Sequence, residues 1–215
     1  MSNSERKITK IERQENNRQR LSIYLDGEFA FGLNDEIVLK HNINVNQTLQ
    51  EDQIEDLLSE DEKKRAKQKA FSYLARRDHS EKELSDKLRR KGFREPIIIG
   101  LIEDLKQSQL INDGTFSRQF ARNKIIQKSI GRRELAFSLK QKGISKDILE
   151  ATLEEVYSEF DEKELALRLA NQKLKTIKNI EPIKVKKRIS DFLFRRGFNW
   201  EIVEQVFEEI SWDKL

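Results

Sequence analysis

The chain has 215 residues, of which 37% are charged and 36% are hydrophobic. That balance excludes one thick apolar core and favours a thin core spread along the chain, as in repeat proteins. The absence of cysteine excludes disulfides, thiolate zinc sites and a cysteine nucleophile. Only eight glycines and two prolines are present, which predicts mostly helix with few long loops. No apolar run approaches the roughly 18 residues of a membrane span, so we expect a soluble, cytoplasmic protein.

The first part of the chain predicts strands. Apolar residues alternate over 21–25 and over 29–33, and the Asp26-Gly27 dipeptide between them is a strong signal for a type I′ hairpin turn. An earlier strand is expected near 8–13, with a turn through Asn16-Asn17. Together these segments predict a small antiparallel meander.

Helix signals follow the strands. Asp35 is placed to cap a short helix over 37–40, and Thr48 with Glu51 has capping-box spacing for a helix that ends at Leu58. The same spacing, a side-chain acceptor followed three residues later by a carboxylate, recurs at Ser59/Glu62, Ser80/Glu83 and Asp161/Glu164. Glycines at 92, 143 and 197 follow basic residues, where a left-handed residue closes a helix.

The rest of the chain contains three imperfect copies of one helical unit. When Gly92, Gly143 and Gly197 are aligned, a basic residue precedes each glycine and apolar residues recur at fixed distances on both sides. The aligned apolar sets are Leu84/Leu135/Ile189, Leu88/Leu139/Leu193, Ile97/Ile148/Ile202, Ile102/Leu153/Phe207 and Leu105/Val156/Ile210. These spacings place the apolar side chains mostly on one face of each helix. A further helix precedes each pair, near 66–74, 116–126 and 165–174.

The predicted fold class is therefore mainly all-α. We expect three tandem three-helix repeats in an elongated, curved array, preceded by a small N-terminal antiparallel β-hairpin or meander with short helices. The expected division is 1–59 for the N-terminal part, then 60–111, 112–160 and 161–215 for the three repeats. Such an array offers a recognition surface and no deep single pocket.

Positive charge is concentrated in the first repeat. Residues 1–59 carry a net charge of −4, whereas residues 60–111 carry a net charge of +4. Lys87, Arg90, Lys91 and Arg94 have i, i+3, i+4, i+7 spacing, which predicts one shared helix face. The candidate contacts to phosphates or to an acidic protein surface are Arg76, Arg77, Lys87, Arg89, Arg90, Lys91, Arg94, Arg132, Arg133, Lys140, Lys142, Lys186, Lys187, Arg195 and Arg196. The alternative is that cations at helix ends complement the helix dipole and maintain solubility.

Catalytic constellations are missing from the sequence. His41 and His79 have no metal-ligand pattern around them, and no Gly-rich phosphate loop or nucleophile elbow occurs. We therefore expect no enzyme activity, no metal and no cofactor. The aromatic residues have the spacing of helix cores, with stacking on bases as the alternative; they are Phe71, Tyr73, Phe116, Phe120, Phe192 and Phe198. Trp212 is either a core residue or an exposed anchor.

Several segments resemble a known family. The segment SEKELSDKLRRKGF at 80–93 resembles the first-repeat signature of the RecX family of recombination regulators. Residues 110–113 with Phe116 and 120–122, and then 131–135 and 139–144, are similar to the second repeat. The resemblance covers about 60–210, and the N-terminal hairpin resembles the extension of longer, Gram-positive-type members. The third repeat departs most from the pattern, with Phe192 and Phe194 where the earlier repeats are more polar.

This resemblance implies a non-enzymatic regulator of the RecA recombinase in homologous recombination, DNA repair and the SOS response. Family members are tandem three-helix repeats that lie in the helical groove of the RecA–single-stranded-DNA filament and typically curb its ATPase and strand exchange. The implied partners are the RecA filament and the single-stranded DNA within it, with weak binding to duplex DNA. No membrane or small-molecule substrate is implied, and we expect a monomer.

Two other functions are compatible with the residues. A general DNA-binding repeat protein would bind duplex DNA tightly, with affinity falling on the order of 10³-fold between 50 and 200 mM salt if six or more phosphates were neutralised. A protein-only scaffold would show no salt-sensitive DNA binding. A groove contact could also either stabilise filaments or cap them.

Overall fold

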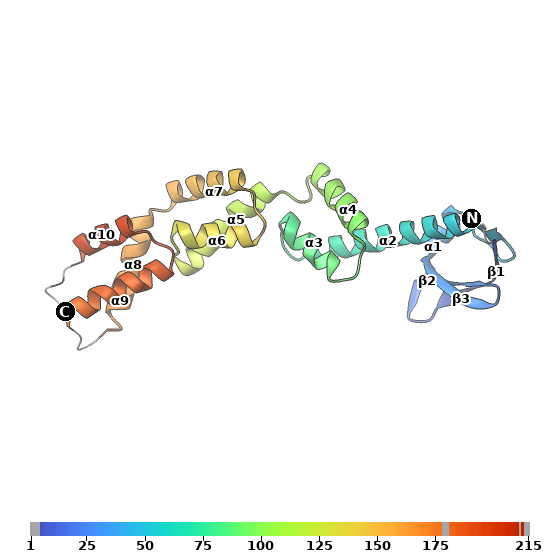
Figure 1. Ribbon diagram of the computed structural model, residues 1–215, viewed down its shortest axis with the longest axis horizontal. Coiled ribbons are helices and arrows are strands. Elements are labelled where there is room, and N and C mark those ends of the chain that lie inside the picture. Colours follow the sequence, from blue (N-terminus) through green and yellow to red (C-terminus); the bar gives the residue numbers. More distant parts are fainter. Residues whose placement is uncertain (1–4, 178–180, 211, 213–215) are drawn as a thin grey trace. The chain divides into compact units, whose positions relative to one another are not determined.

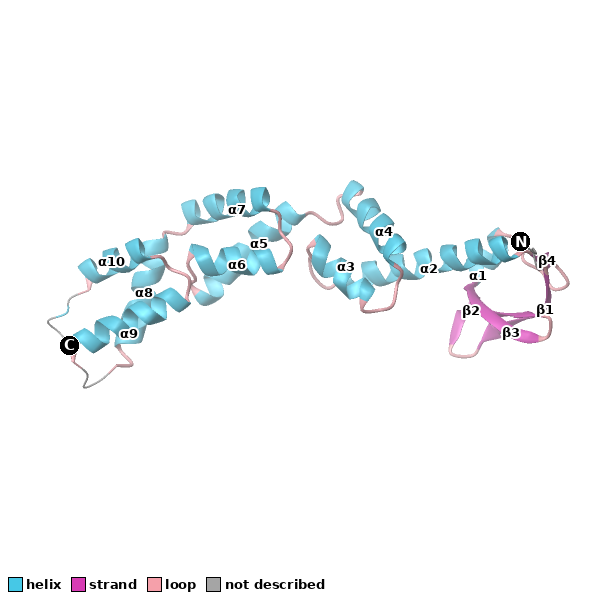
Figure 2. Cartoon of the chain, in the orientation of Figure 1, coloured by secondary structure: helices cyan, strands magenta, loops and turns pink. Residues whose placement is uncertain are grey.

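The computed structural model describes residues 5–177, 181–210 and 212. Its elements are traced in Figure 1, and Figure 2 shows them by type. The described residues form two compact units. The first comprises the chain up to Ala75 together with Lys87–Glu103, and the second comprises Arg76–Asp86 together with the chain from Asp104 onward. Each unit is described by itself below.

The first unit contains a four-stranded antiparallel sheet, drawn in magenta in Figure 2. Its strands are β1 (Arg6–Gln14), β2 (Asn17–Leu25), β3 (Glu28–Asn34) and β4 (Thr48–Leu49), in the order β3-β2-β1-β4. The predicted meander is therefore confirmed. The short edge strand β4 was not predicted, because two residues carry too little pattern to be recognised.

The two hairpin turns differ in how well the sequence located them. Asp26 and Gly27 have φ values of 52° and 93°, as a type I′ turn requires at both central positions. The β1–β2 turn lies at residues 15 and 16, because Gln14 pairs with Asn17. That is one residue earlier than the expected turn through Asn16-Asn17.

Helices α1 (Asp35–Lys40) and α2 (Glu51–Leu74) complete the N-terminal part of this unit. Asn34 caps α1 by accepting from the Glu36 amide at 3.1 Å, so the cap predicted at Asp35 was wrong by one residue. The helix breaks predicted at Leu58 and Ser59 were also wrong, since α2 runs without interruption across the expected boundary at 59/60.

A buried ion pair joins the sheet to α2. Asp61 on α2 is 3% exposed, and its carboxylate accepts two hydrogen bonds from the Arg20 guanidinium at 3.1 Å and one from the Asn34 amide at 2.8 Å. Because removing one partner of a buried pair leaves an uncompensated charge, this pair fixes α2 against β2 and β3. Around it, a small apolar core is formed by Ile8, Ile23, Leu25, Leu33, Ile37, Val38, Ile43, Leu49 and Leu57.

The predicted three-helix repeats are confirmed. The second half of α2 is the first helix of the first repeat. The remaining helices are α3 (Glu81–Arg89), α4 (Glu95–Gln107), α5 (Asp113–Lys128), α6 (Arg132–Gln141), α7 (Lys146–Glu159), α8 (Glu162–Leu174), α9 (Pro182–Arg195) and α10 (Trp200–Glu209). The aligned apolar positions eight and four residues before each glycine are all fully buried. The elongated, curved arrangement and the expected domain boundaries stay predictions.

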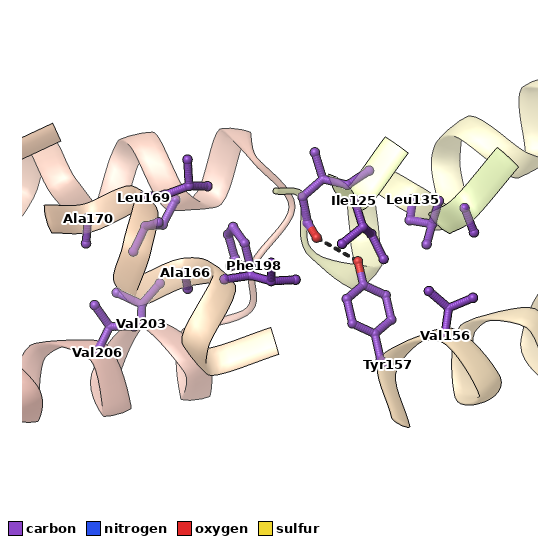
Figure 3. Close-up of a cluster of buried hydrophobic side chains, with 14 of the residues drawn as sticks. Ile125, Leu135, Val156, Tyr157, Ala166, Leu169, Ala170, Phe198, Val203 and Val206 are labelled. Atoms are coloured by element: carbon purple, nitrogen blue, oxygen red, sulfur yellow. Dashed lines mark hydrogen bonds between the residues drawn. The ribbon is translucent and has the colours of Figure 1, made fainter. Parts of the chain in front are cut away.

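The second and third repeats share one apolar core in the second unit. In Figure 3, Phe198 lies beside Ala166 and Val203 of the third repeat, and Tyr157 of the second repeat donates a hydrogen bond to the Ile130 carbonyl at 2.7 Å. Such a thin core, continued from one repeat to the next, is what the low hydrophobic content predicted.

The three aligned glycines end the middle helix of each repeat in the left-handed conformation. Gly92, Gly143 and Gly197 have φ values of 82°, 82° and 89°, which glycine adopts without the steric cost of a Cβ. Their surroundings differ. A Cβ on Gly197 would lie 2.4 Å from the Glu134 amide nitrogen, whereas a Cβ on Gly92 would meet no heavy atom within 4 Å.

This difference gives a matched pair of substitutions. Gly92→Ala should cost about 1 kcal/mol, from the left-handed conformation alone. Gly197→Ala should cost about 2–4 kcal/mol, because the methyl group also overlaps the backbone of Glu134. Urea unfolding followed by circular dichroism measures both, and equal losses would contradict the close approach at Gly197.

Candidate protein and nucleic-acid interface

The repeats of the second unit meet through a contact between a helix start and a glycine turn. We use the term glycine turns for residues 91–93, 142–144 and 196–198. At the first junction the Ser80 hydroxyl, which also accepts from the Glu83 amide, donates to the Lys142 carbonyl at 2.7 Å. A Cβ on Gly143 would lie 2.6 Å from Cβ of Lys82. The helix start of α3 therefore lies directly against the turn at 142–144.

The second junction repeats the first in the same register. Gly131 stands twelve residues before Gly143, as Ser80 stands twelve before Gly92. Its amide donates to the Arg196 carbonyl at 2.9 Å, and the Arg133 amide donates to the Gly197 carbonyl at 3.1 Å. A backbone amide thus replaces the serine hydroxyl, which brings the two chains closer.

A carboxylate holds the cation of the first junction. Glu83 accepts hydrogen bonds from Arg77 at 2.9 Å and from Lys142 at 2.5 Å. Burial of the Glu83 carboxyl by itself raises its pKa, but the hydrogen bonds from Arg77 and Lys142 outweigh burial and lower the pKa to about 2. Lys142 and Arg77 are therefore structural ion-pair partners.

A second carboxylate at each junction accepts a backbone amide at the start of the middle helix. Asp113 accepts from the Glu81 amide at 2.9 Å, and Glu162 accepts from the Arg132 amide at 2.9 Å. Burial raises the pKa of both carboxyls, against the lowering effect of these amides. Both carboxylates start the first helix of the following repeat, so each junction ties three helix ends together.

The predicted basic helix face is not formed. Helix α3 ends at Arg89, and Arg90 and Lys91 belong to the turn that Gly92 closes. Arg94 follows the turn, so the i, i+3, i+4, i+7 spacing does not place these side chains on one helix. The expectation was wrong because the left-handed glycine ends the helix in the middle of the pattern.

More than half of the candidate cations have partners within their own unit. In the first unit, Arg89 pairs with Glu95 at 2.7 Å, Arg94 with Glu62 at 2.5 Å, and Lys87 lies 4.8 Å from the Tyr73 ring centroid. In the second unit, tied candidates are Arg77 and Lys142 on Glu83, Arg132 on Glu162, Lys186 over the Trp212 ring, and Arg196 on the Lys128 carbonyl. Arg90 is exposed. These partners limit how many cations can meet a ligand.

The other candidates are more accessible. Within the described parts of the chain, six of them are exposed and their side chains make no ion pair or ring contact: Arg76, Lys91, Arg133, Lys140, Lys187 and Arg195. Their charges are not offset by a neighbouring carboxylate, so a phosphate or an acidic protein surface can pair with them without breaking an internal contact. These six residues form the free-cation set.

Comparison with known proteins was made on this fold. Models of the RecX family match four ranges, each inside one expected segment: the regulatory protein RecX N-terminal domain at 6–50, and the first, second and third three-helix domains of RecX at 66–105, 112–153 and 161–207. The regulatory protein RecX of Clostridium beijerinckii is 33% identical over 95% of both chains. The chain belongs to the RecX family of regulatory proteins.

Other RecX proteins agree with this assignment. RecX of Clostridioides difficile is 31% identical over 94% of this chain and 95% of its own. A crystal structure of regulatory protein RecX matches with a TM-score of 0.69 and 25% identity, covering 95% of this chain and all of that one. A crystal structure of RecX from Lactobacillus salivarius shares the fold, with a TM-score of 0.64 over 72% of this chain.

Aromatic residues of this RecX-family chain are placed partly as expected. Phe116 and Phe198 are buried, whereas Phe71 is 41% exposed. Trp212 is not an exposed anchor, because it packs edge-on against Phe207 and donates to the Phe207 carbonyl at 2.9 Å. The sequence analysis missed Trp200, which is 53% exposed and stacks on Phe194. Its position, three residues after the aligned glycine, holds Glu95 and Lys146 in the other repeats.

The search for other kinds of site concerns the described residues alone. No group of three or more His, Asp or Glu side chains among them is placed to hold a metal ion. His79 is buried, with Nδ1 2.9 Å from the Arg77 carbonyl, as expected for a residue at a helix entry. None of the described helices combines the length and apolar character needed to cross a membrane.

The pairing of Glu83 predicts a pH dependence. Its pKa is lowered to about 2 from 4.5, so the stability it contributes is present above about pH 4.5 and is lost as the pH falls towards 2. Glu83→Gln should therefore destabilise the chain at pH 7 by on the order of 2–3 kcal/mol. The difference from the parent chain should vanish near pH 2.

Unfolding by urea at pH 7, 4.5, 3 and 2 measures this difference. Glu95→Gln is the matched control, because Glu95 pairs with Arg89 on the surface, where solvent screens the interaction. Its effect should be smaller at every pH. A Glu83→Gln difference that stays constant from pH 7 to 2 would contradict the assigned pairing.

Proposed function

We propose that the chain is a non-enzymatic regulator of the RecA recombinase that binds the RecA–single-stranded-DNA filament, in its helical groove, and inhibits its ATPase and strand exchange. The observation that carries the proposal is membership of the RecX family over nearly the whole length of the chain. The relatives are named as regulatory proteins, in keeping with a role without catalysis. Action in the cytoplasm, as a monomer, belongs to the same proposal.

The charge pattern supports a mixed protein and phosphate partner. The net charge is +4, and many candidate cations already serve internal ion pairs. A ligand that is all phosphate would need a larger set of available cations to bind tightly at physiological salt. A filament offers protein surface together with phosphates, so a few free cations in several repeats suffice for binding.

The proposed mechanism assigns different work to the two sets of cations. The tied cations, such as Arg77, Lys142 and Arg132, keep each repeat in register with the next. The free-cation set meets the filament, where it competes with contacts that RecA subunits need for ATP hydrolysis and strand exchange. Regulation follows from occupancy of the groove, with no chemical step on the protein.

A general DNA-binding protein is the second candidate, supported by the exposed Trp200 and Phe194 stack, on which a base could stack. It differs in one measurable respect. Its binding to bare DNA would be tight and would fall steeply as salt rises. Under the proposed function, binding to bare single-stranded DNA is weak compared with binding to the filament.

The function is tested by titrating the chain into RecA on single-stranded DNA and measuring ATP hydrolysis. The parent chain should inhibit near filament concentrations. The variant Arg133→Ala/Lys140→Ala/Arg195→Ala removes three free cations and should weaken inhibition by about tenfold or more. These side chains are exposed, so helicity should not change.

A matched control removes the same charge elsewhere. Lys128, Lys146 and Lys175 are exposed and lie outside the candidate set. Their combined replacement by alanine should leave inhibition within about twofold of the parent chain, since few interfacial contacts carry most of the binding energy. Equal weakening by both variants would show a general charge effect, and no inhibition by the parent chain would overturn the proposal.

A further inference from the structure

The glycine turn of the first repeat has the same backbone contacts as the other two. In the turn at 91–93, the amide of Lys91 donates to Leu88 at 2.9 Å and the amide of Phe93 donates to the same carbonyl at 3.4 Å. The equivalent distances are 3.0 and 3.2 Å in the turn at 142–144, and the same two values recur in the turn at 196–198. All three turns therefore present a glycine and a preceding carbonyl in one geometry.

The occupancy of the three turns differs. The turns at 142–144 and 196–198 each receive a helix start of the preceding repeat, through the Lys142 and Arg196 carbonyls. No repeat precedes the first one. In the described structure, no heavy atom lies within 4 Å of the Cβ position of Gly92, and the Lys91 side chain makes no ion pair. The first turn thus has the docking geometry without a docked helix.

A pocket opens beside this turn, inside the first unit. It has a volume of about 600 Å³, and Gly92, Phe93 and Arg94 form one of its walls. The opposite walls come from β3 and α2, with Phe31 and the 37%-exposed Leu58 as apolar contributors. The pocket is of a size to receive side chains from the first turn of a helix.

The charges around the turn match the helix starts that dock elsewhere in the chain. Ser80 with Glu83, and Gly131 with Glu134, combine a small residue with a glutamate three residues later. At the first junction that glutamate pairs with Lys142, the residue before the glycine. Lys91 holds the same position in the first turn and is exposed. A glutamate at the third position of an incoming helix would therefore find its cation there.

We propose that the turn at 91–93 and its pocket bind the N-terminal end of an α-helix from a partner protein, with serine or glycine at the first position and glutamate three residues later. The helix start places its amide or hydroxyl donor on the Lys91 carbonyl and its glutamate on the Lys91 ammonium. This interaction goes beyond the proposed function, because it is defined by a helix end and needs no DNA.

A second copy of this chain does not fit as the partner. The helix starts at Ser80 and Gly131 are already docked within the chain. In the third repeat the equivalent position is Val185, which is buried inside α9 three residues after its start. The chain therefore has no unused helix start of the required type among its described residues, and the partner is a different protein.

The test uses the full chain and a synthetic helix start. The probe is a peptide with the sequence of residues 78–90, extended by an alanine-rich segment and held helical by a side-chain staple on its outer face, with helicity checked by circular dichroism. Titration into ¹⁵N-labelled full chain should shift the amides of Lys91, Gly92 and Phe93. Shifts confined to the turn at 142–144, or no shifts at all, would overturn the proposal.

A charge swap sharpens the test. Lys91→Glu in the chain should weaken binding of the peptide by about tenfold, since like charges would face each other. Changing the glutamate of the peptide to lysine should restore binding to this variant and weaken binding to the parent chain. Lys146→Glu, on the exposed start of α7, is the matched control and should bind the original peptide normally. Equal binding by the Lys91 and Lys146 variants would contradict the assigned site.

Discussion

The contact between a left-handed glycine turn and the start of a neighbouring helix governs the register of the second unit. Gly143 and Gly197 allow this contact, because any Cβ at either position would overlap the helix start it meets. Each contact places a basic residue beside a carbonyl or carboxylate of the preceding repeat, as Lys142 lies on Glu83. The thin apolar core alone would fix the helices loosely, since few large side chains bridge successive repeats. Directional hydrogen bonds at the junctions supply the missing specificity.

The same contact determines which cations are available for a ligand. Residues that immediately precede a docked glycine are used internally, whereas Lys91 precedes an undocked glycine and stays exposed. Cations on outer helix faces, such as Lys140 and Arg195, are likewise outside the junctions. A regulator built this way keeps a low net charge and still presents scattered cations, which suits a partner that is part protein and part phosphate. Excess charge for non-specific DNA binding is not needed.

Much of the fold was predictable from the sequence because its signals are local. The Asp26-Gly27 turn, the helix-ending glycines and the apolar spacing each depend on backbone geometry within a few residues. The candidate site was less predictable. The pairing of Glu83 with Lys142 joins residues 59 apart, and no local pattern reveals it. The predicted basic face failed for a local reason that the sequence did contain, since Gly92 interrupts the helix between its members. The repeat alignment also held an unused signal, because it places Ser80 and Gly131 at one register before their glycines.

The separation of tied and free cations is tested most directly by lysine acetylation footprinting, with mass spectrometry, of the chain alone and bound to the RecA–single-stranded-DNA filament. In the free chain, Lys91, Lys140 and Lys187 should be acetylated quickly, and Lys142 slowly because Glu83 holds it. On the filament, the first three should become protected, while exposed Lys146 should not change. Protection of Lys142 alone, or no protection of Lys91, Lys140 and Lys187, would contradict the account.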